Sequence, residues 1–245
     1  MTGSKVVRAS GAPKDRAGPS TYPLSFAEFL ETRLDDPGKR KGERTRDRLK
    51  AATTRLLERA GYRDLRVTDI NEEAGVSNAL FYVYFQNKDV ITREVLTDFL
   101  AYLETFRSRD SKSKSTEEGI YIGNLRYTQM FKANAGLMRC LFQFSDEFPD
   151  FALHWQAWNA NWRDRVVRAL NRAEELKQAD PTDIMFSVAA LGSMVDAYLR
   201  MAFIDKDSTL IGVMPEDDVD KVALRLTRLW VRGLFSREMR WPPDA

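Results

Sequence analysis

Residues 67–88 read VTDINEEAGVSNALFYVYFQNK, and this stretch decides the fold of the chain. Two short segments with helical spacing surround Gly75, and a glycine readily takes the left-handed conformation that turns a chain at the end of a helix. Ser77 stands where a hydroxyl can cap a second helix, running from Asn78 to about Phe85. The stretch predicts a helix-turn-helix, although helix–glycine–helix corners also occur in all-α proteins that bind no nucleic acid.

The two short helices divide into a buried and an outward side. The apolar residues that can bury one side are Ile70, Ala74, Val76, Phe81 and Phe85. Tyr82, Tyr84 and Lys88 then remain to face a partner, and phenol hydroxyls and an ammonium group are donors suited to phosphate oxygens. In a helix-turn-helix, the first residues of the second helix enter the DNA major groove.

Positive charge is concentrated next to this motif. Residues 39–66 contain eleven Lys or Arg against four acidic residues, whereas the whole chain carries a net charge of only +2. A local positive field of this kind attracts the phosphate backbone through counterion release, although a charged helix face is often merely solvated. The composition therefore favours a nucleic-acid partner.

Residues 46–96 resemble the TetR family of transcriptional regulators. The resemblance rests on a helix with Leu49, Ala52, Leu56, Leu57 and Ala60 on one face, followed by Gly61-Tyr62, Val67, Asp69-Ile70, Ala74-Gly75-Val76-Ser77, Tyr82, Tyr84-Phe85 and Asn87-Lys88-Asp89. It implies an all-α fold with an N-terminal three-helix helix-turn-helix domain, then a larger helical bundle with a dimerisation interface. The expected divisions are an N-terminal extension at 1–40, a DNA-binding domain at 41–90, and a ligand-binding and dimerisation domain at 91–245.

The resemblance also implies which residues contact DNA. It places Tyr82, Tyr84 and Lys88 at phosphates, and Asn78, Ala79 and Leu80 near base edges. The full set of expected DNA contacts is Arg44, Arg46, Arg66, Thr68, Ser77, Asn78, Ala79, Leu80, Tyr82, Tyr84 and Lys88. Asn78 has an amide able to make two hydrogen bonds to adenine, so we expect it to read sequence.

Three residues depart from the family pattern. Arg66 stands where a capping Ser or Thr is usual, so either Thr68 caps the helix two residues later or Arg66 itself contacts a phosphate. Asn71 replaces a common Ala, and Leu80 replaces a common Thr. Leu80 can offer a thymine only methyl contact.

The N-terminal extension contains a polar segment and an apolar one. Residues 1–20 are rich in Gly, Pro, Lys and Arg, which predicts disorder. Residues 23–34 predict a short amphipathic helix that the family does not usually carry. This helix either packs on the core or partner subunit, or supports a DNA-contacting arm that includes Lys39, Arg40 and Lys41.

The rest of the chain has helical spacing and no strand-like alternation. Capping residues and prolines predict helices at 87–107, 115–132, 134–144, 149–178, 180–203 and 215–237, with an exposed loop at 108–115. No apolar run approaches the roughly 18 residues that span a bilayer, and the N-terminus lacks a signal-peptide core. We therefore expect a cytoplasmic protein with no membrane partner.

Aromatic residues gather between residues 121 and 162, where Phe151, Trp155, Trp158 and Trp162 share one helix face. Such a face is more often core, but large rings near polar groups also suit a pocket for an apolar ligand, which the resemblance places in this part of the bundle. The expected ligand-binding residues are Tyr127, Phe131, Phe144, Phe151, Trp155, Trp158, Trp162, Met194 and Tyr198. We expect a hydrophobic effector.

Two segments near the C-terminus predict association. Ala189, Ala190, Gly192 and Ser193 allow close backbone approach, and Val219, Val222, Leu226, Leu229, Trp230 and Gly233 form an apolar stripe. Across a two-fold axis they would form a four-helix interface, as in the family, or else both stripes are intrachain core.

The residues contain no enzyme signature. Cys140 and His154 are the only cysteine and histidine, so a disulfide within the chain and a Cys-based metal site are excluded, and no cofactor is expected. The resulting hypothesis is a homodimeric regulator, in most such proteins a repressor, that binds a palindromic operator in double-stranded DNA. A hydrophobic effector would release it by displacing the helix at 87–107. The alternatives are an effector-independent structural or nucleoid-associated DNA binder and a protein-binding adaptor.

Overall fold

A computed structural model describes residues 23–34, 36–107, 113, 115–210 and 218–235. Within those residues every regular element is helical and no strand occurs, which confirms the all-α prediction. The predicted tail at 1–20, most of the loop at 108–115, and the ends of the last predicted helix, Pro215 and Arg237, lie outside this described part.

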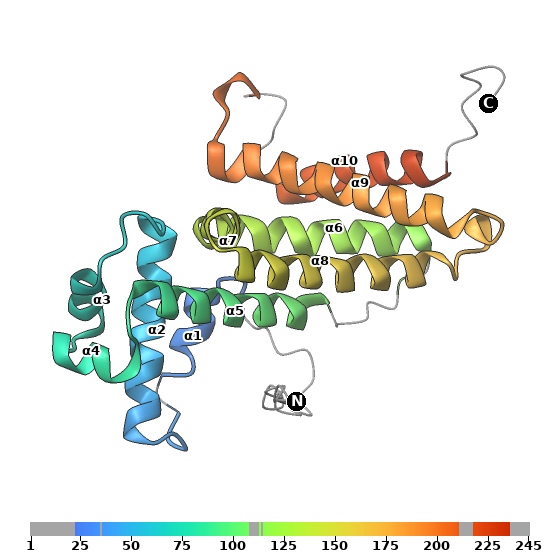
Figure 1. Ribbon diagram of the computed structural model, residues 1–245. Coiled ribbons are helices and arrows are strands. Elements are labelled where there is room, and N and C mark those ends of the chain that lie inside the picture. Colours follow the sequence, from blue (N-terminus) through green and yellow to red (C-terminus); the bar gives the residue numbers. More distant parts are fainter. Residues whose placement is uncertain (1–22, 35, 108–112, 114, 211–217, 236–245) are drawn as a thin grey trace.

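The helices form a small N-terminal group and a larger bundle (Figure 1). The first group comprises α1 (Phe26–Glu31), α2 (Lys41–Arg59), α3 (Val67–Ala74) and α4 (Asn78–Tyr84). Then α5 (Lys88–Arg107) leads into the bundle of α6 (Thr116–Ala133), α7 (Ala135–Glu147), α8 (Pro149–Leu170), α9 (Pro181–Arg200) and α10 (Val219–Phe235). Shorter turns occur at Glu174–Leu176, Met201–Asp205 and Ser208–Leu210. The α5 helix thus belongs to both groups, because it begins beside α4 and runs beneath the bundle.

Local capping determines where several of these helices begin. The Asn87 side chain accepts hydrogen bonds from the N–H groups of Asp89 and Val90, both at 3.0 Å, at the start of α5. Ser115 accepts one from Glu118 N at 3.1 Å, and Asp180 accepts one from Thr182 N at 2.7 Å ahead of Pro181. These caps satisfy N–H groups that have no partner within the helix, as their sequence positions predicted.

The α8 helix ends earlier than expected. The sequence predicted a helix to about residue 178, but α8 ends at Leu170 and Ala173 has an extended backbone. The break buries Leu170, Ala173 and Leu176, which are 3%, 7% and 6% exposed. Burial of these apolar side chains against the bundle stabilises the bend.

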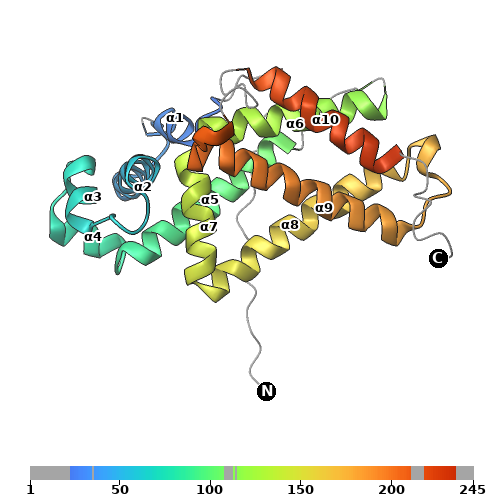
Figure 2. The same cartoon turned by 90° about the horizontal axis from the view of Figure 1, so that it is seen from above.

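The bundle has three layers in Figure 1, with α5 below, α6 and α8 in the middle, and α9 and α10 above. Seen from above in Figure 2, α10 crosses α6 and α9 crosses the second half of α8. The segment Pro181–Asp205, which includes α9, is long and apolar enough by composition to cross a membrane, a property that the sequence analysis missed. Its inner face packs on α8 and α10, and its Asp196 accepts a 2.6 Å hydrogen bond from Tyr127. These contacts are those of a bundle helix.

Helix α1 is anchored where the two groups meet. Phe26 is 1% exposed and contacts Phe99 and Tyr102 of α5, at ring-centroid distances of 5.5 and 5.2 Å. The fully buried Asn134, between α6 and α7, accepts a hydrogen bond from Phe26 N at 2.7 Å and donates one to Leu24 O at 2.8 Å. The structure thus has α1 packed on the core, as one interpretation predicted, while DNA contact by Lys39, Arg40 and Lys41 stays a prediction.

A second contact between the groups joins α2 to α7. Glu58 accepts a hydrogen bond from Gly136 N at 2.9 Å, and a Cβ atom added to Gly136 would lie 2.3 Å from the backbone oxygen of Glu58. Burial raises the pKa of Glu58 to about 7, against the opposing effects of N–H groups from Leu137 and Gly136 and of the Arg139 charge. The folded chain therefore holds the Glu58 proton more tightly than an unfolded chain does.

This raised pKa predicts that Glu58 lowers stability as pH rises. The cost is absent below the ordinary pKa of 4.5 and increases until the pH passes about 7. Glu58→Gln keeps an acceptor for Gly136 N, so we expect it to raise the free energy of unfolding at pH 8 by roughly 1–2 kcal/mol and to change it little at pH 4.5. Thermal melts of both proteins across this range, with the exposed Glu175→Gln as control, measure the effect. A difference in melting temperature between Glu58→Gln and the wild type that is the same at every pH would contradict the prediction.

Candidate nucleic-acid interface and bundle cavity

The helix-turn-helix forms as the local sequence predicted. Gly75 has φ 65° and ψ 40°, and its N–H bonds to carbonyls of α3. Ser77 accepts a hydrogen bond from Leu80 N at 3.2 Å and so caps α4. Ile70 of α3 and Phe81 of α4 are fully buried, which fixes the two helices against α2 and α5. Helix α3 begins at Val67, and Arg66 is its N-cap residue, with no capping hydrogen bond from the side chain. Thr68 is therefore not the N-cap.

The outward face of α4 carries Asn78, Ala79, Tyr82 and Val83, all exposed. Tyr82 is 54% exposed and Val83 is 72% exposed. Leu80 and Tyr84 are half-buried, and the Tyr84 hydroxyl lies beside Gly42 of α2. Val83 was not among the expected DNA contacts, although it follows Ala79 by four residues and so lies on the same face of the helix.

Asn78 is held by a neighbouring amide. Asn71 of α3 is 6% exposed, and its Nδ2 donates a 3.0 Å hydrogen bond to Asn78 Oδ1. The acceptor atom of Asn78 is therefore engaged, while its Nδ2 remains available as a donor. The expected two-bond contact with adenine needs both atoms, so Oδ1 would have to accept a second hydrogen bond beside that from Asn71 or exchange one for the other.

Lys88 points toward the protein. Its ammonium donates to the carbonyl oxygens of Tyr62, Arg63 and Leu65 at 3.3, 3.4 and 3.1 Å, and lies 4.8 Å from the centroid of the Tyr62 ring. These contacts hold the loop between α2 and α3. Lys88 therefore has a structural role in this loop, in addition to the phosphate contact expected from the sequence.

Much of the positive charge in residues 39–66 is paired within the chain. Arg46, one of the expected DNA contacts, donates two hydrogen bonds to Glu94 and lies 4.6 Å from the centroid of the Phe85 ring. The other paired cations in this stretch are Lys39 with Asp47, Lys50 with Asp98, Arg55 with Glu31 and Glu73, Arg59 with Glu73, and Arg63 with Glu147.

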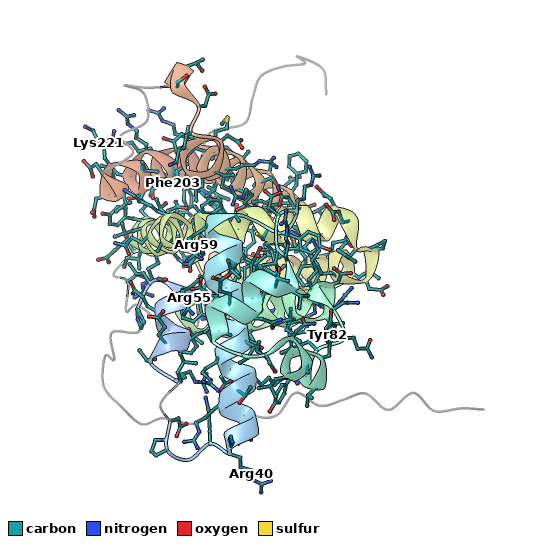
Figure 3. All side chains as sticks on the ribbon, turned by 90° about the vertical axis from the view of Figure 1, so that its left-hand side faces the viewer. Arg40, Arg55, Arg59, Tyr82, Phe203 and Lys221 are labelled. Atoms are coloured by element: carbon teal, nitrogen blue, oxygen red, sulfur yellow. The ribbon has the colours of Figure 1, made fainter. Side chains whose placement is uncertain are left out.

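The remaining exposed cations lie mainly at the start of α2. Arg40, Lys41 and Arg44 are exposed there, and no ion pair of theirs is found among the described residues. Arg66 is exposed at the start of α3, and the exposed Arg48 donates a 3.5 Å hydrogen bond to Thr45. Figure 3 shows Arg40 at the tip of α2 and Tyr82 on α4, both at the part of the molecule remote from Lys221 of the bundle. The available positive charge and the exposed face of α4 thus lie in the same lobe.

The bundle contains a partly open cavity of about 670 Å³. It lies among α6, α8, α9 and α10, with Leu103 of α5 in its wall. Of the nine expected ligand-binding residues, Tyr127 and Trp162 line this cavity.

The other seven expected residues lie elsewhere in the core. Phe144 of α7 contacts Tyr62, in the loop between α2 and α3, and Phe151 of α8, at 5.1 Å each. Trp155 and Trp158 stack at 5.0 Å, and Phe131 is fully buried near Phe203. Met194 and Tyr198 are half-buried against the core. The aromatic stripe of α8 therefore faces the cavity only at Trp162.

The residues of α9 and α10 that were expected to form a dimer interface are partly buried in the core and partly exposed. Val222, Leu226 and Trp230 are buried at 2%, 3% and 4% exposure, so they belong to the intrachain core. Gly192 also faces inward, because an added Cβ would lie 2.5 Å from the Trp162 ring. The exposed residues of these two helices that remain include Phe186 at 73%, Leu229 at 45%, Ala190, Ser193 and Gly233.

Comparison with known proteins identifies the family. The profile described as "Bacterial regulatory proteins, tetR family" matches residues 49–95, which include α3, α4 and the turn between them. Residues 49–95 are thus a helix-turn-helix domain of the TetR family type. The helix-turn-helix-type transcriptional regulator EthR of Mycolicibacterium smegmatis is 23% identical over 189 residues, covering 76% of this chain and 83% of that protein.

A second relative matches over a shorter region. YdgC, an uncharacterised helix-turn-helix-type transcriptional regulator of Bacillus subtilis, is 31% identical over 112 residues, 46% of this chain. The chain spans only 53% of the length of that relative.

Solved structures share the TetR fold beyond the helix-turn-helix. A tetR-family regulatory protein from Rhodococcus RHA1 has a TM-score of 0.63 at 15% identity, covering 82% of this chain and 100% of that one. The fatty acid degradation regulator FadR of Bacillus halodurans has a TM-score of 0.58 at 16% identity, covering 81% of this chain and 100% of the other. The bundle as well as the helix-turn-helix therefore has the architecture of these proteins.

Proposed function

We propose that this TetR-family protein is a ligand-responsive transcriptional regulator, most simply a cytoplasmic repressor that binds a palindromic operator as a dimer. The observation that carries the proposal is the shared position of the exposed α4 face and of the unpaired cations at the start of α2. Phosphate contacts from Arg40, Lys41, Arg44 and Tyr82 would position the protein, and the N-terminal residues of α4 would reach base edges.

The exposed apolar residues of α9 and α10 support a two-fold dimer. Phe186, Ala190 and Ser193 follow each other at spacings of four and three, so they share one face of α9. A large side chain beside small ones suits close helix packing against a second copy. Such a dimer would set two α4 helices about one turn of DNA apart, or a multiple of it.

Selection of bound sequences from a randomised duplex library tests the operator proposal. We expect two half-sites related by two-fold symmetry, and sedimentation of the complex should show an even number of chains. Recovery of a single, unsymmetric site bound by one chain would contradict the dimer. The absence of any DNA binding at low salt would contradict the regulator itself.

The cavity favours ligand response over effector-independent DNA binding. A structural or nucleoid-associated binder of the same fold needs no internal space, whereas a volume of about 670 Å³ is within the range of small-molecule sites. Since Leu103 of α5 forms part of the wall, occupancy of the cavity can bias the position of the helix that follows the DNA-binding group.

The contact between Asn71 and Asn78 predicts a change of base preference. In the wild type, Asn78 would present its Nδ2 donor, so we expect a base with major-groove acceptors, guanine N7 and O6 or thymine O4, at its position. Asn71→Asp can only accept, so the Asn78 amide should turn and present Oδ1 to adenine N6 or cytosine N4. The change is expected to be about 5- to 100-fold at one base position.

Asn71→Ala is the matched control, because it frees both amide atoms of Asn78 and should favour adenine. Selection from a library randomised at one half-site measures all three proteins, after melting curves establish that each is folded. An identical base at that position in all three would exclude a positioning role for Asn71.

A further inference from the structure

The wall of the bundle cavity is positively charged, and a purely apolar effector would leave this charge without a partner. Four arginines line it, against one carboxylate, Asp196. They are Arg126 on α6, Arg165 and Arg168 on α8, and Arg172 just after α8. Arg168 and Arg172 are exposed, and the structure gives them no ion pair among the described residues. Three of the four arginines come from one eight-residue stretch, so the positive charge is concentrated at one part of the wall.

Aromatic and aliphatic side chains form much of the remaining wall. Trp162 and Trp230 meet edge to face at 6.4 Å, and Leu103, Ile122 and Val195 also line the cavity. Trp230 is 4% exposed, and its indole N–H is buried without a hydrogen-bond acceptor. A buried donor without an acceptor is costly, and an oxygen of a bound molecule could satisfy it. The cavity therefore combines an apolar surface with groups that donate hydrogen bonds.

From this arrangement we infer that the cavity binds an anionic amphiphile, a molecule with a carboxylate or phosphate head and an apolar tail. Guanidinium groups bind both of these heads in a two-bond geometry, which explains arginine rather than lysine at the site. The tail would lie against Trp162 and its aliphatic neighbours. This inference rests on the proposed ligand response and adds an anionic head to the hydrophobic effector expected from the sequence.

One of these arginines is already bound to the helix that reaches the DNA-binding group. Arg165 donates a 3.0 Å hydrogen bond to Glu104 of α5, and both side chains are only about one-third exposed, at 40% and 35%. The other end of α5 contacts α2, where Glu94 binds Arg46 and Asp98 binds Lys50. An acidic ligand head would compete with Glu104 for Arg165. Ligand binding would then weaken the contact between α8 and α5. This contact would couple the cavity to the DNA-binding helices, as a response to a ligand requires.

Decanoate and 1-decanol test the inference, because they share a tail and differ in the charge of the head. Isothermal titration of the full-length protein at pH 7.5 is expected to detect decanoate and to give at least tenfold weaker binding for 1-decanol. Decyl phosphate distinguishes the two possible head groups, since either anion supports the shared chemistry. Equal binding of decanol and both anions, or binding of none of the three, would overturn the inference.

Variants locate the binding to the arginines. The double variant Arg165→Gln/Arg168→Gln should weaken decanoate binding at least tenfold, whereas Arg163→Gln, on the same helix but outside the cavity wall, should not change it. Glu104→Gln removes the competing carboxylate, so decanoate should bind about threefold more tightly. Unchanged decanoate affinity in the double variant would show that the anion binds elsewhere.

Operator binding by the ligand-free proteins separates this inference from the proposed function. If the wild type binds operator DNA and decanoate does not weaken that binding, the ligand assignment fails while the regulator stands. If the ligand-free wild type binds no DNA, the proposed function fails whatever the cavity holds.

Discussion

Replacing Arg40, Lys41 and Arg44 together with glutamine is expected to weaken DNA binding by about 100-fold or more at 0.1 M salt. These cations are exposed at the start of α2, in the lobe that presents Tyr82. Each phosphate contact contributes about 0.9 to the slope of log affinity against log salt, so loss of three contacts per chain should make the slope shallower by about 2.7 per bound subunit. Fluorescence anisotropy with a labelled duplex across a salt series measures both quantities.

The matched control uses two arginines from the same positive stretch. Arg55 and Arg59 donate to Glu73 at 2.7 and 2.8 Å, and they lie farther along α2 from Arg40 in Figure 3. Their replacement by glutamine should leave the salt slope unchanged, because their charge is already neutralised within the chain. An equal loss of slope in both variants would mean that overall charge, rather than the tip of α2, determines binding.

Gly136→Ala is expected to cause the largest loss of stability among single substitutions considered for this chain. The new Cβ would lie 2.3 Å from the backbone oxygen of Glu58, and backbone cannot move aside as a flexible side chain can. Separation of α7 from α2 should cost about 3 kcal/mol, which lowers the melting temperature by roughly 6–12 °C.

Gly123→Ala serves as the control for this substitution. Gly123 is also inside a helix, but nothing lies within 4 Å of its added Cβ. Alanine favours helix by about 1 kcal/mol over glycine, so this variant should melt at the same or a higher temperature. Melting of Gly136→Ala within 2 °C of the wild type, roughly the effect of 0.5–1 kcal/mol, would show that the two helices can separate at little cost.

The parts of the fold that were predictable from sequence depend on interactions between residues that are close together in the chain. Gly75 turns the chain by its own backbone, while Ser77 and Asn87 cap helices through N–H groups two or three residues ahead. Such interactions are determined by residue type and spacing alone. The turn, the helix starts and the all-α class were therefore predictable.

The sites depended on contacts that spacing does not reveal. Arg46 was expected at DNA, but its partner Glu94 lies 48 positions later in the chain. The aromatic face of α8 was predicted as one surface, yet a helix of 22 residues is about 33 Å long and meets different neighbours along its length. Phe151 is therefore in the core against Phe144 of α7, whereas Trp162 reaches the cavity.

The anchoring of α1 by Asn134 has a consequence for synthesis of the protein. The Phe26 N–H and the Asn134 amide are separated by 108 positions, so the docking site of α1 does not exist when α1 leaves the ribosome. At a synthesis rate of about 5–20 residues per second, Asn134 is made roughly 5–20 s after Phe26. Contacts of Phe26 with α5 can form earlier, once Phe99 and Tyr102 are made, so the hydrogen bonds of Asn134 complete the anchoring of α1 late in synthesis.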